Sequence, residues 1–95
     1  MFEWDARKEA FNLQKHSVSF DEAKTAFIDV LGWDGEDIKH SLKEPRRLRL
    51  AQATSGKILV IAYTIRRQGN ENITRIISAR AASRRERKRY QKRGN

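Results

Sequence analysis

The chain contains 95 residues, of which 21 are Lys or Arg, 12 are Asp or Glu and none is Cys, and its formal net charge is +9. This length suits one domain, residues 1–95, with one core. The lack of Cys excludes disulfides, cysteine nucleophiles and thiolate metal sites, and it fits a reducing cytoplasm. No apolar run reaches the ~20 residues of a membrane-spanning helix, and the N-terminus lacks the apolar region of a signal peptide. We therefore expect a cytoplasmic protein that does not enter a membrane.

The positive charge is concentrated at the C-terminus. Residues 80–95 contain eight of the Lys and Arg residues and one acid, Glu86. A cationic segment on a near-neutral body attracts phosphate backbones, so we expect a polyanionic partner, either nucleic acid or an acidic protein. A membrane-surface helix would carry bulky apolar residues, and after Ser83 only Tyr90 qualifies. The alternative is a solvated charge run, which is the usual fate of such a segment.

The N-terminal third predicts a strand and two short helices. Residues 2–4 alternate as in a strand, and Asp5 is a plausible N-cap for a helix that runs to about His16. Residues 19–22 form a capping box that starts a second helix. Its predicted buried face contains Phe20, Ala23 and Phe27. The predicted apolar stripe of the first helix contains Ala6, Ala10 and Leu13, with Phe11 beside them.

The middle of the chain predicts strands. Residues 29–33 suggest one strand and residues 34–43 a polar loop. From Arg46 the period becomes two, with Leu48 and Leu50 facing one way and Arg47 and Arg49 the other, as in a half-exposed strand. Residues 58–65 are almost all apolar, which predicts a central strand covered on both faces.

The last third predicts one more strand and a helix. A Gln-Gly-Asn turn leads into a strand over residues 73–79, and a second capping box over residues 83–86 starts the final helix. We expect residues 92–95 to fray. The predicted order is β-α-α-β-β-β-β-α, an α+β domain with helices packed on one face of a small antiparallel sheet.

Both ends of the chain carry distinctive residues. The N-terminal part has Phe2-Glu3-Trp4-Asp5, Lys15-His16 and Val18-Ser19-Phe20. Further along are the Glu44-x-Arg46 pair, Arg75-Ile76-Ile77-Ser78-Ala79-Arg80 and Arg84-Arg85-Glu86-Arg87. In these residues the chain resembles the BrnT family of bacterial toxins over nearly its whole length. The resemblance implies a compact RelE-like ribonuclease fold, toxicity through RNA cleavage that inhibits translation, and neutralisation by an antitoxin of the BrnA type. It also implies that operator DNA is contacted only through the antitoxin complex.

Metal-free RNA cleavage requires a base for the 2′-hydroxyl, stabilisation of the charged phosphorane and an acid for the 5′-oxygen. The acids are scattered without metal-ligand spacing, so we expect neither a metal nor another cofactor. Arg suits the phosphate because its planar fork stays charged and donates two parallel hydrogen bonds. The predicted catalytic residues are Arg80, Arg66, Arg46, His16, Tyr90 and Glu44.

Each of these candidates has a structural alternative. Arg80 can form an ion pair with Glu86 or Glu44, and Arg66 can be a solvated strand end. His16 can simply cap its helix, and Tyr90 can pack the last helix on the sheet. Glu44 with Arg46 can be a surface ion pair, although the resemblance implies an acid–base pair at the rim of the site. His40, in the predicted polar loop, receives no role.

Basic residues around these candidates predict RNA-backbone contacts. Lys8 and Lys15 lie seven residues apart and therefore on one helical face. The predicted RNA-binding residues are Lys8, Lys15, Arg67, Arg84, Arg85, Arg87, Lys88 and Arg89. Two other classes stay open from the sequence: a DNA-binding module without catalysis, and an interaction protein whose basic face serves an acidic partner.

Overall fold

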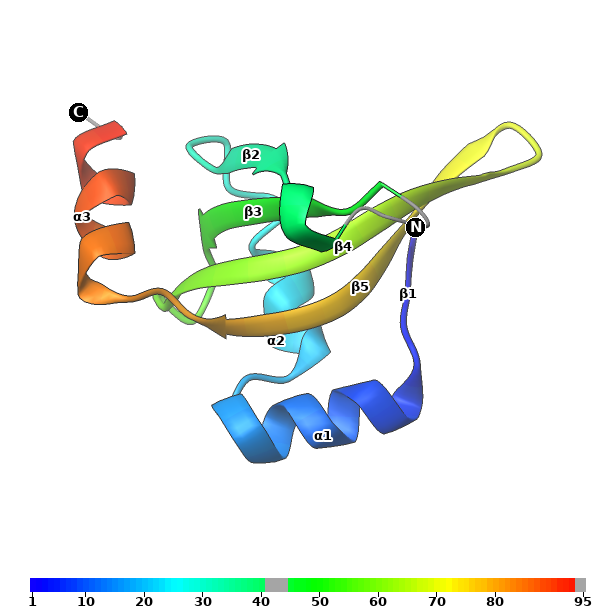
Figure 1. The fold of residues 1–95 in the computed structure, drawn as a ribbon, viewed down its shortest axis with the longest axis horizontal. Helices are drawn as coiled ribbons and strands as arrows, with labels where there is room; N and C mark the ends of the chain where they lie inside the picture. The colour runs from blue at the N-terminus through cyan, green and yellow to red at the C-terminus, as the bar shows by residue number, and fades with distance from the viewer. Residues whose placement is uncertain (41–44, 94–95) are drawn as a thin grey trace.

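The computed structural model describes residues 1–40 and 45–93, which form a mixed α+β fold (Figure 1). The predicted contribution of Glu44 and the fraying of residues 94–95 lie outside this part of the chain. The helical elements are α1 (Ala6–His16), α2 (Phe20–Thr25), the 3₁₀ turn η1 (Ile38–His40) and α3 (Arg84–Arg93). The strands are β1 (Phe2–Glu3), β2 (Trp33–Glu36), β3 (Arg47–Gln52), β4 (Ile58–Gln68) and β5 (Glu71–Ala81). The α+β class and the order of the main elements agree with the sequence prediction.

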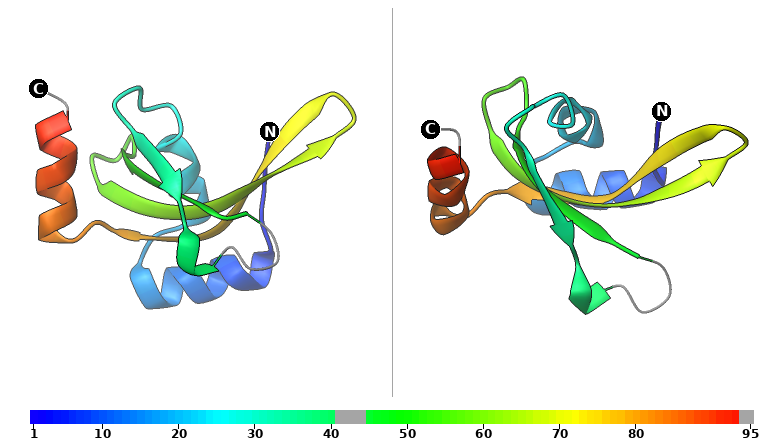
Figure 2. Two further views of the ribbon diagram at one scale, coloured as in Figure 1. Left: turned by 45° about the horizontal axis from the view of Figure 1, so that its top comes forward. Right: turned by 90° about the horizontal axis from the view of Figure 1, so that it is seen from above.

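The five strands form one sheet in the order β1-β5-β4-β3-β2. The three pairs from β2 to β5 are antiparallel, as predicted, but β1 pairs with β5 in parallel through Phe2 opposite Thr74. The long β4–β5 hairpin turns at Gly69, whose φ of 63° is in the left-handed region that glycine tolerates. Its tip extends beyond the rest of the molecule (Figure 2). Because β1 is so short, residues 76–81 of β5 form an edge of the sheet.

The two faces of the sheet are built differently. One face is covered by α1 and α2 and contains the larger core, with Phe20, Leu59, Ile61 and Ile76 almost fully buried. The opposite face has a smaller cluster around Leu50, Val60, Ala82 and Tyr90, which brings α3 against the sheet. The prediction that all helices pack on one face was therefore wrong for α3. Figure 2 shows α3 at the far end of the sheet from the hairpin tip.

Helix α1 docks through polar side chains, and the predicted apolar stripe was wrong. Phe11 is 65% exposed and Leu13 is 50% exposed, whereas Asn12 is buried. The Asn12 side-chain amide donates to the carbonyl oxygens of Val18 (2.9 Å) and Ala79 (2.8 Å) and accepts from the Ala79 N–H (3.0 Å). It therefore completes the hydrogen bonding of β5 where a neighbouring strand would otherwise lie.

The helix caps form largely as predicted. Asp5 accepts from the backbone N–H groups of the first turn of α1, and Ser19 accepts from Glu22 at the start of α2. At α3 the capping box is reciprocal, because Ser83 accepts from the Glu86 N–H (3.2 Å) and Glu86 accepts from the Ser83 N–H (2.8 Å). Helix α3 continues through Arg93, so Lys92 and Arg93 are helical rather than frayed.

The segment between α2 and β3 differs from prediction. The strand lies at Trp33–Glu36 instead of residues 29–33, and η1 occupies part of the predicted polar loop. The cause is Arg49, which is buried rather than solvated on a half-exposed strand. Its guanidinium donates to the carbonyl oxygens of Ala26 (3.0 Å) and Asp29 (2.5 Å) and forms an ion pair with Asp34. These bonds fix the turn before β2, and a side chain at Gly32 would overlap the guanidinium.

Within the described residues, no helix is both long enough and apolar enough to cross a lipid bilayer.

Candidate functional site

Three adjoining pockets run from α1, past the edge of β5, to the face of the sheet that carries α3. The α1 pocket, of about 480 Å³, lies between Lys8, Lys15 and His16 of α1 and the edge of β5. The central pocket, of about 470 Å³, is bounded by α1, η1 and strands β3 to β5. The Trp33 pocket, of about 300 Å³, lies between Trp33, the β3 and β4 strands and α3. Shared lining residues join the pockets into one track, with His16 and Arg80 at the first border and Leu48 and Val60 at the second.

Arg80 lies at the border of the first two pockets. It is paired with Val60 across β4 and β5, and its guanidinium binds both carboxylate oxygens of Glu86 (2.7 and 3.0 Å). Hydrogen bonds from Arg80 lower the pKa of Glu86 to about 2, and the same pair raises the pKa of Arg80. The predicted structural alternative, an ion pair with Glu86, is therefore present. The Arg80 side chain remains 44% exposed, so it can also bind an anion in the pockets.

His16 lies on the same border because Asn12 fixes its helix. The Asn12 amide holds α1 to Ala79 of β5, and His16 follows Asn12 by one helical turn on the same side. His16 therefore lines both the α1 pocket and the central pocket, beside Ser78 and Arg80. The imidazole is half-buried and can reach a ligand in either pocket.

A second histidine, His40, lines the central pocket, and the sequence analysis assigned it no role. Its Nδ1 lies 3.2 and 3.0 Å from the two carboxylate oxygens of Asp37. A carboxylate on one ring nitrogen orients an imidazole and leaves the other nitrogen for a substrate. The available signal was the spacing Asp37-x-x-His40, which puts both side chains on one side of a single turn. Because residues 34–43 were predicted to be a loop, this spacing was not interpreted as a helical turn.

Arg46 is the second predicted phosphate ligand in the central pocket. It immediately precedes β3, and its carbonyl oxygen accepts from the Asp37 N–H (2.8 Å), which ties the start of β3 to the turn that carries His40. The central pocket thus combines His16, His40, Arg46 and Arg80.

The structure does not bring Arg66 and Arg67 to this site. Val60 is opposite Arg80, and Arg66 is six residues further along β4, or about 20 Å at the rise of an extended strand. Arg66 instead forms two hydrogen bonds of 2.8 Å with Glu3 of β1. Arg67 is exposed and pairs with Asn72 near the turn of the hairpin. Arg66, which the sequence predicted as a catalytic residue, therefore lies away from the central pocket.

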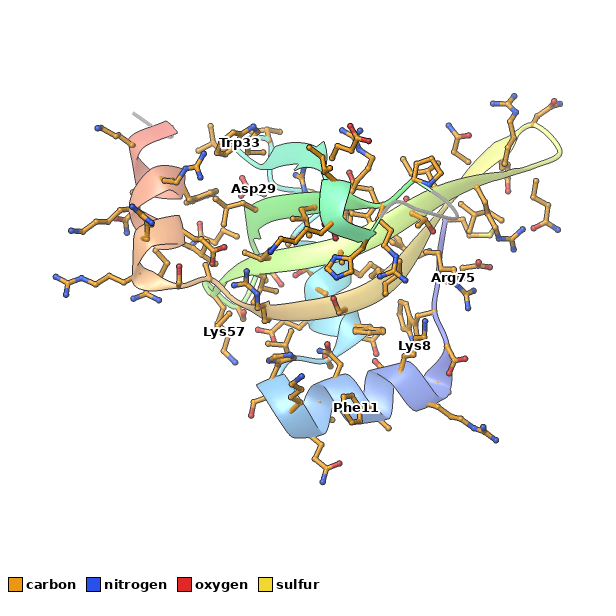
Figure 3. All side chains as sticks on the ribbon, in the orientation of Figure 1. Lys8, Phe11, Asp29, Trp33, Lys57 and Arg75 are labelled. Atoms are coloured by element: carbon orange, nitrogen blue, oxygen red, sulfur yellow. The ribbon has the colours of Figure 1, made fainter. Side chains whose placement is uncertain are left out.

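Tyr90 also lies elsewhere. It is buried against Leu50 and Val60, and its hydroxyl donates to Asp29 at 2.5 Å. Burial and this hydrogen bond raise the pKa of Tyr90 to about 12. Figure 3 shows Asp29 and Trp33 on the side of the sheet that faces α3. Tyr90 thus holds α3 on the sheet, which is the structural alternative named above, and it does not line the three pockets.

The remaining predicted RNA-binding residues either line the pockets or lie on α3. Lys8 and Lys15 line the α1 pocket, and Arg89 lines the Trp33 pocket with its guanidinium carbon 4.6 Å from the Trp33 ring centroid. Arg87 donates to the carbonyl oxygen of Ala82 (2.8 Å). The exposed residues of α3 that the sequence predicted to bind RNA are Arg84, Arg85, Arg87, Lys88 and Arg89.

The central pocket brings two imidazole side chains together with two guanidinium groups. An imidazole has ring nitrogens that can donate or accept a hydrogen bond, and two guanidinium groups can neutralise a phosphate. No group of three or more His, Cys, Asp or Glu side chains suited to a metal ion occurs among residues 1–40 and 45–93.

Comparison with known proteins identifies the family. Residues 4–86 match the family described as the ribonuclease toxin BrnT of type II toxin–antitoxin systems. The chain belongs to this family. It is a ribonuclease toxin with endoribonuclease activity, its substrate is RNA, and its partner is a cognate antitoxin.

The fold agrees with a solved BrnT structure. The crystal structure of the Brucella abortus ribonuclease toxin BrnT matches with a TM-score of 0.62 and 21% sequence identity, over 88% of this chain and 99% of that chain. No curated protein matches the sequence. At this identity the likeness establishes the fold, and the site residues are argued from the geometry above.

Proposed function

We propose that the chain cleaves RNA in the central pocket by attack of a 2′-hydroxyl on the adjacent phosphorus, without a metal ion, and thereby inhibits translation. The observation that carries this proposal is that His16, His40, Arg46 and Arg80 line one pocket at the edge of the sheet. Two guanidinium groups there neutralise the phosphorane, and two imidazoles supply the base and the acid.

The two histidines differ in surroundings, which suggests a division of roles. The Asp37 carboxylate orients the His40 imidazole, and this arrangement favours removal of the 2′-hydroxyl proton by the other ring nitrogen. His16 ends α1, and a cation is favoured at the C-terminal end of a helix. We assign His16 the proton for the departing 5′-oxygen. The products are a 2′,3′-cyclic phosphate and a 5′-hydroxyl, and both imidazoles exchange their protons with water before the next cycle.

The basic surface around the pocket suits both RNA and an acidic antitoxin. The exposed cations of α3, together with Lys8 and Lys15, give backbone attraction without base recognition. A BrnA-type antitoxin that covers this surface would block RNA entry, and contact with operator DNA would then require the antitoxin complex. Because RNA and a coexpressed antitoxin share the bacterial cytoplasm, we propose that the chain acts there.

The test is cleavage of single-stranded RNA by the purified chain in the presence of EDTA. We expect products that end in a 2′,3′-cyclic phosphate. His16→Ala and His40→Ala should each lower the cleavage rate by about 10²- to 10⁴-fold, the usual contribution of a general acid or base. The matched control is Lys24→Ala, an exposed change on α2 away from the pockets, which should leave the rate unchanged.

Intact RNA that is nevertheless bound in a salt-dependent manner would show a nucleic-acid-binding module instead. Normal growth of bacteria that express the chain without its antitoxin would contradict the toxin mechanism. Cleavage that stops in EDTA and returns with Mg²⁺ would contradict the metal-free route.

A further inference from the structure

The Trp33 pocket has a different chemical character from the central pocket that it joins. Its floor is apolar and consists of Leu48, Leu50 and Val60, which lie on the α3 face of the sheet. Its wall is the indole ring of Trp33, and its rim carries Glu36 and Arg89. A volume of about 300 Å³ is at the lower end of the range for small-molecule sites, so the pocket suits one planar group.

Trp33 and Arg89 form the kind of surface on which nucleic-acid bases stack. The Arg89 guanidinium carbon lies 4.6 Å from the centroid of the Trp33 ring, within the range of cation–π contacts. Aromatic rings and guanidinium planes are the usual stacking partners of unpaired RNA bases. Arg89 is exposed, so its side chain can shift to admit a base against the indole ring.

The pocket also directly adjoins the proposed phosphate site. Leu48 and Val60 line both pockets, and the Arg80–Glu86 pair spans the border with Arg80 in the central pocket and Glu86 in the Trp33 pocket. A nucleotide whose phosphate is bound by Arg80 can therefore place its base, or that of its neighbour, in the adjoining Trp33 pocket.

The rim determines which bases fit. An ionised carboxylate only accepts hydrogen bonds, and among the described residues Glu36 and Glu86 are the carboxylates that line the pocket. Adenine, cytosine and guanine carry an exocyclic amino group that can donate to a carboxylate. Uracil has no amino group, and its ring N3–H lies between two carbonyl oxygens that repel a carboxylate. An aliphatic side chain from a protein partner would fill the floor but offer these carboxylates no donor.

We infer that the Trp33 pocket binds one unpaired RNA base with an exocyclic amino group, beside the phosphate held in the central pocket. This inference rests on the proposed function. It gives the toxin a base preference located on the α3 side of the scissile phosphate.

The experiment measures binding of 2′-O-methyl trinucleotides of adenine, cytosine or uracil to the full chain, by quenching of Trp33 fluorescence. A Trp4→Phe background leaves Trp33 as the sole tryptophan, and the difference between wild type and Trp33→Phe gives the same signal. We expect the adenine and cytosine trinucleotides to quench Trp33 and to bind on the order of tenfold more tightly than the uracil trinucleotide, the effect of one hydrogen bond to a charged group.

Glu36→Gln should reduce this preference, because the amide can also donate to the uracil carbonyl oxygens. The matched control is Glu71→Gln at the start of β5, an exposed carboxylate near the hairpin tip, which should preserve the preference. Equal affinities for the three trinucleotides, or binding without a change in Trp33 fluorescence, would overturn the inference.

Failure of the proposed function would look different. A 2′-O-methyl group blocks the nucleophile, so this binding does not depend on cleavage, and intact unmodified RNA would count against the catalytic proposal alone. If Trp33→Leu weakens binding of the antitoxin and leaves trinucleotide affinity and preference unchanged, the pocket receives a protein side chain and the base assignment is wrong.

Discussion

Two arginine–glutamate pairs lie toward opposite ends of the β4–β5 hairpin, and in each pair two guanidinium nitrogens bind one carboxylate. Arg66 binds both carboxylate oxygens of Glu3, and Arg80 binds both carboxylate oxygens of Glu86. The arginine side chains are 49% and 44% exposed, respectively. Only Arg80 lies beside pockets that also contain histidines. An arginine–glutamate ion pair alone therefore does not indicate a functional site. The side chains that neighbouring elements place around the arginine are the better indicator.

The largest expected difference between the two pairs is the loss of RNA cleavage when each guanidinium is removed in turn. Arg80→Ala should lower RNA cleavage by about 10²- to 10³-fold, the usual effect of losing one group that stabilises charge in a transition state. Arg66→Ala removes the ion pair at the other end, where Arg75 still binds Glu3, and should change cleavage by less than about threefold, since such pairs contribute little to stability. Initial rates on one RNA substrate, with thermal unfolding to verify folding, provide the measurement. Equal losses in the two variants would contradict the site.

The two ends also differ in how β5 is held. Asn12 makes three hydrogen bonds, two with the backbone of Ala79 and one with the carbonyl oxygen of Val18, close to Arg80. Asn12→Ala leaves buried backbone groups without partners and should lower the free energy of unfolding by about 3 kcal/mol. Urea unfolding gives this value, and amide hydrogen exchange should accelerate at Ala79 more than at the hairpin tip. Gln14→Ala, an exposed change on the same helix, is the control and should stay within about 0.5 kcal/mol.

Helix α3 should loosen when its buried tyrosine loses the hydroxyl. Tyr90→Phe removes the hydrogen bond to Asp29 and should cost about 1 kcal/mol in the free energy of unfolding. The folded pKa of about 12 exceeds the ordinary value of 10. The contribution of the neutral phenol is therefore complete below pH 10 and is lost as the pH rises from 10 to 12. Urea midpoints of wild type and Tyr90→Phe should converge over this interval, and parallel curves would contradict the assignment.

The smallest expected effect is on the free energy of unfolding at acidic pH. The pKa of Glu86 falls from 4.5 to about 2 through hydrogen bonds from Arg80, and the pKa of Glu3 falls by the same amount through Arg66 and Arg75. A lowered pKa gives stability that is present above pH 4.5 and lost as the pH falls toward 2. Glu86→Gln should therefore flatten the stability curve in this window, by under ~1 kcal/mol because the pair is near the surface. Glu3→Gln should flatten it in the same direction, as followed by circular dichroism.

Local signals in the sequence predicted much of the fold. The caps at Asp5, Ser19 and Ser83 depend on residues within one helical turn, and the alternation in β3 and the apolar run in β4 are local patterns as well. The ribonuclease family was also predictable from the residues at the two ends of the chain, and the match over residues 4–86 confirms it.

The features that sequence patterns did not predict depend on contacts between distant residues. Asn12 is buried because it binds Ala79, which lies 67 residues away in the chain. Arg49 is buried because the turn after α2 supplies two carbonyl acceptors and Asp34. Each of these polar residues sits at a position that a period-based analysis assigns to solvent. For the same reason the sequence did not predict the pairing of β2 with β3, nor the position of His40 in the turn that follows β2.

For the candidate site, residue type was a better guide than position. His16, Arg46 and Arg80 were predicted separately and line one pocket, whereas Arg66 and Tyr90 have the same chemistry but lie elsewhere. Only the strand register reveals that Arg66 is near the other end of the hairpin from Arg80.

The side-chain amide of Asn12 has a consequence for assembly. Since it already occupies the N–H and C=O of Ala79, an extended segment from another molecule cannot add to β5 at this position unless α1 first moves away. The same amide thus discourages fibril growth along this edge of the sheet and keeps a strand-donating partner from the Ala79 backbone, next to Arg80 of the proposed site.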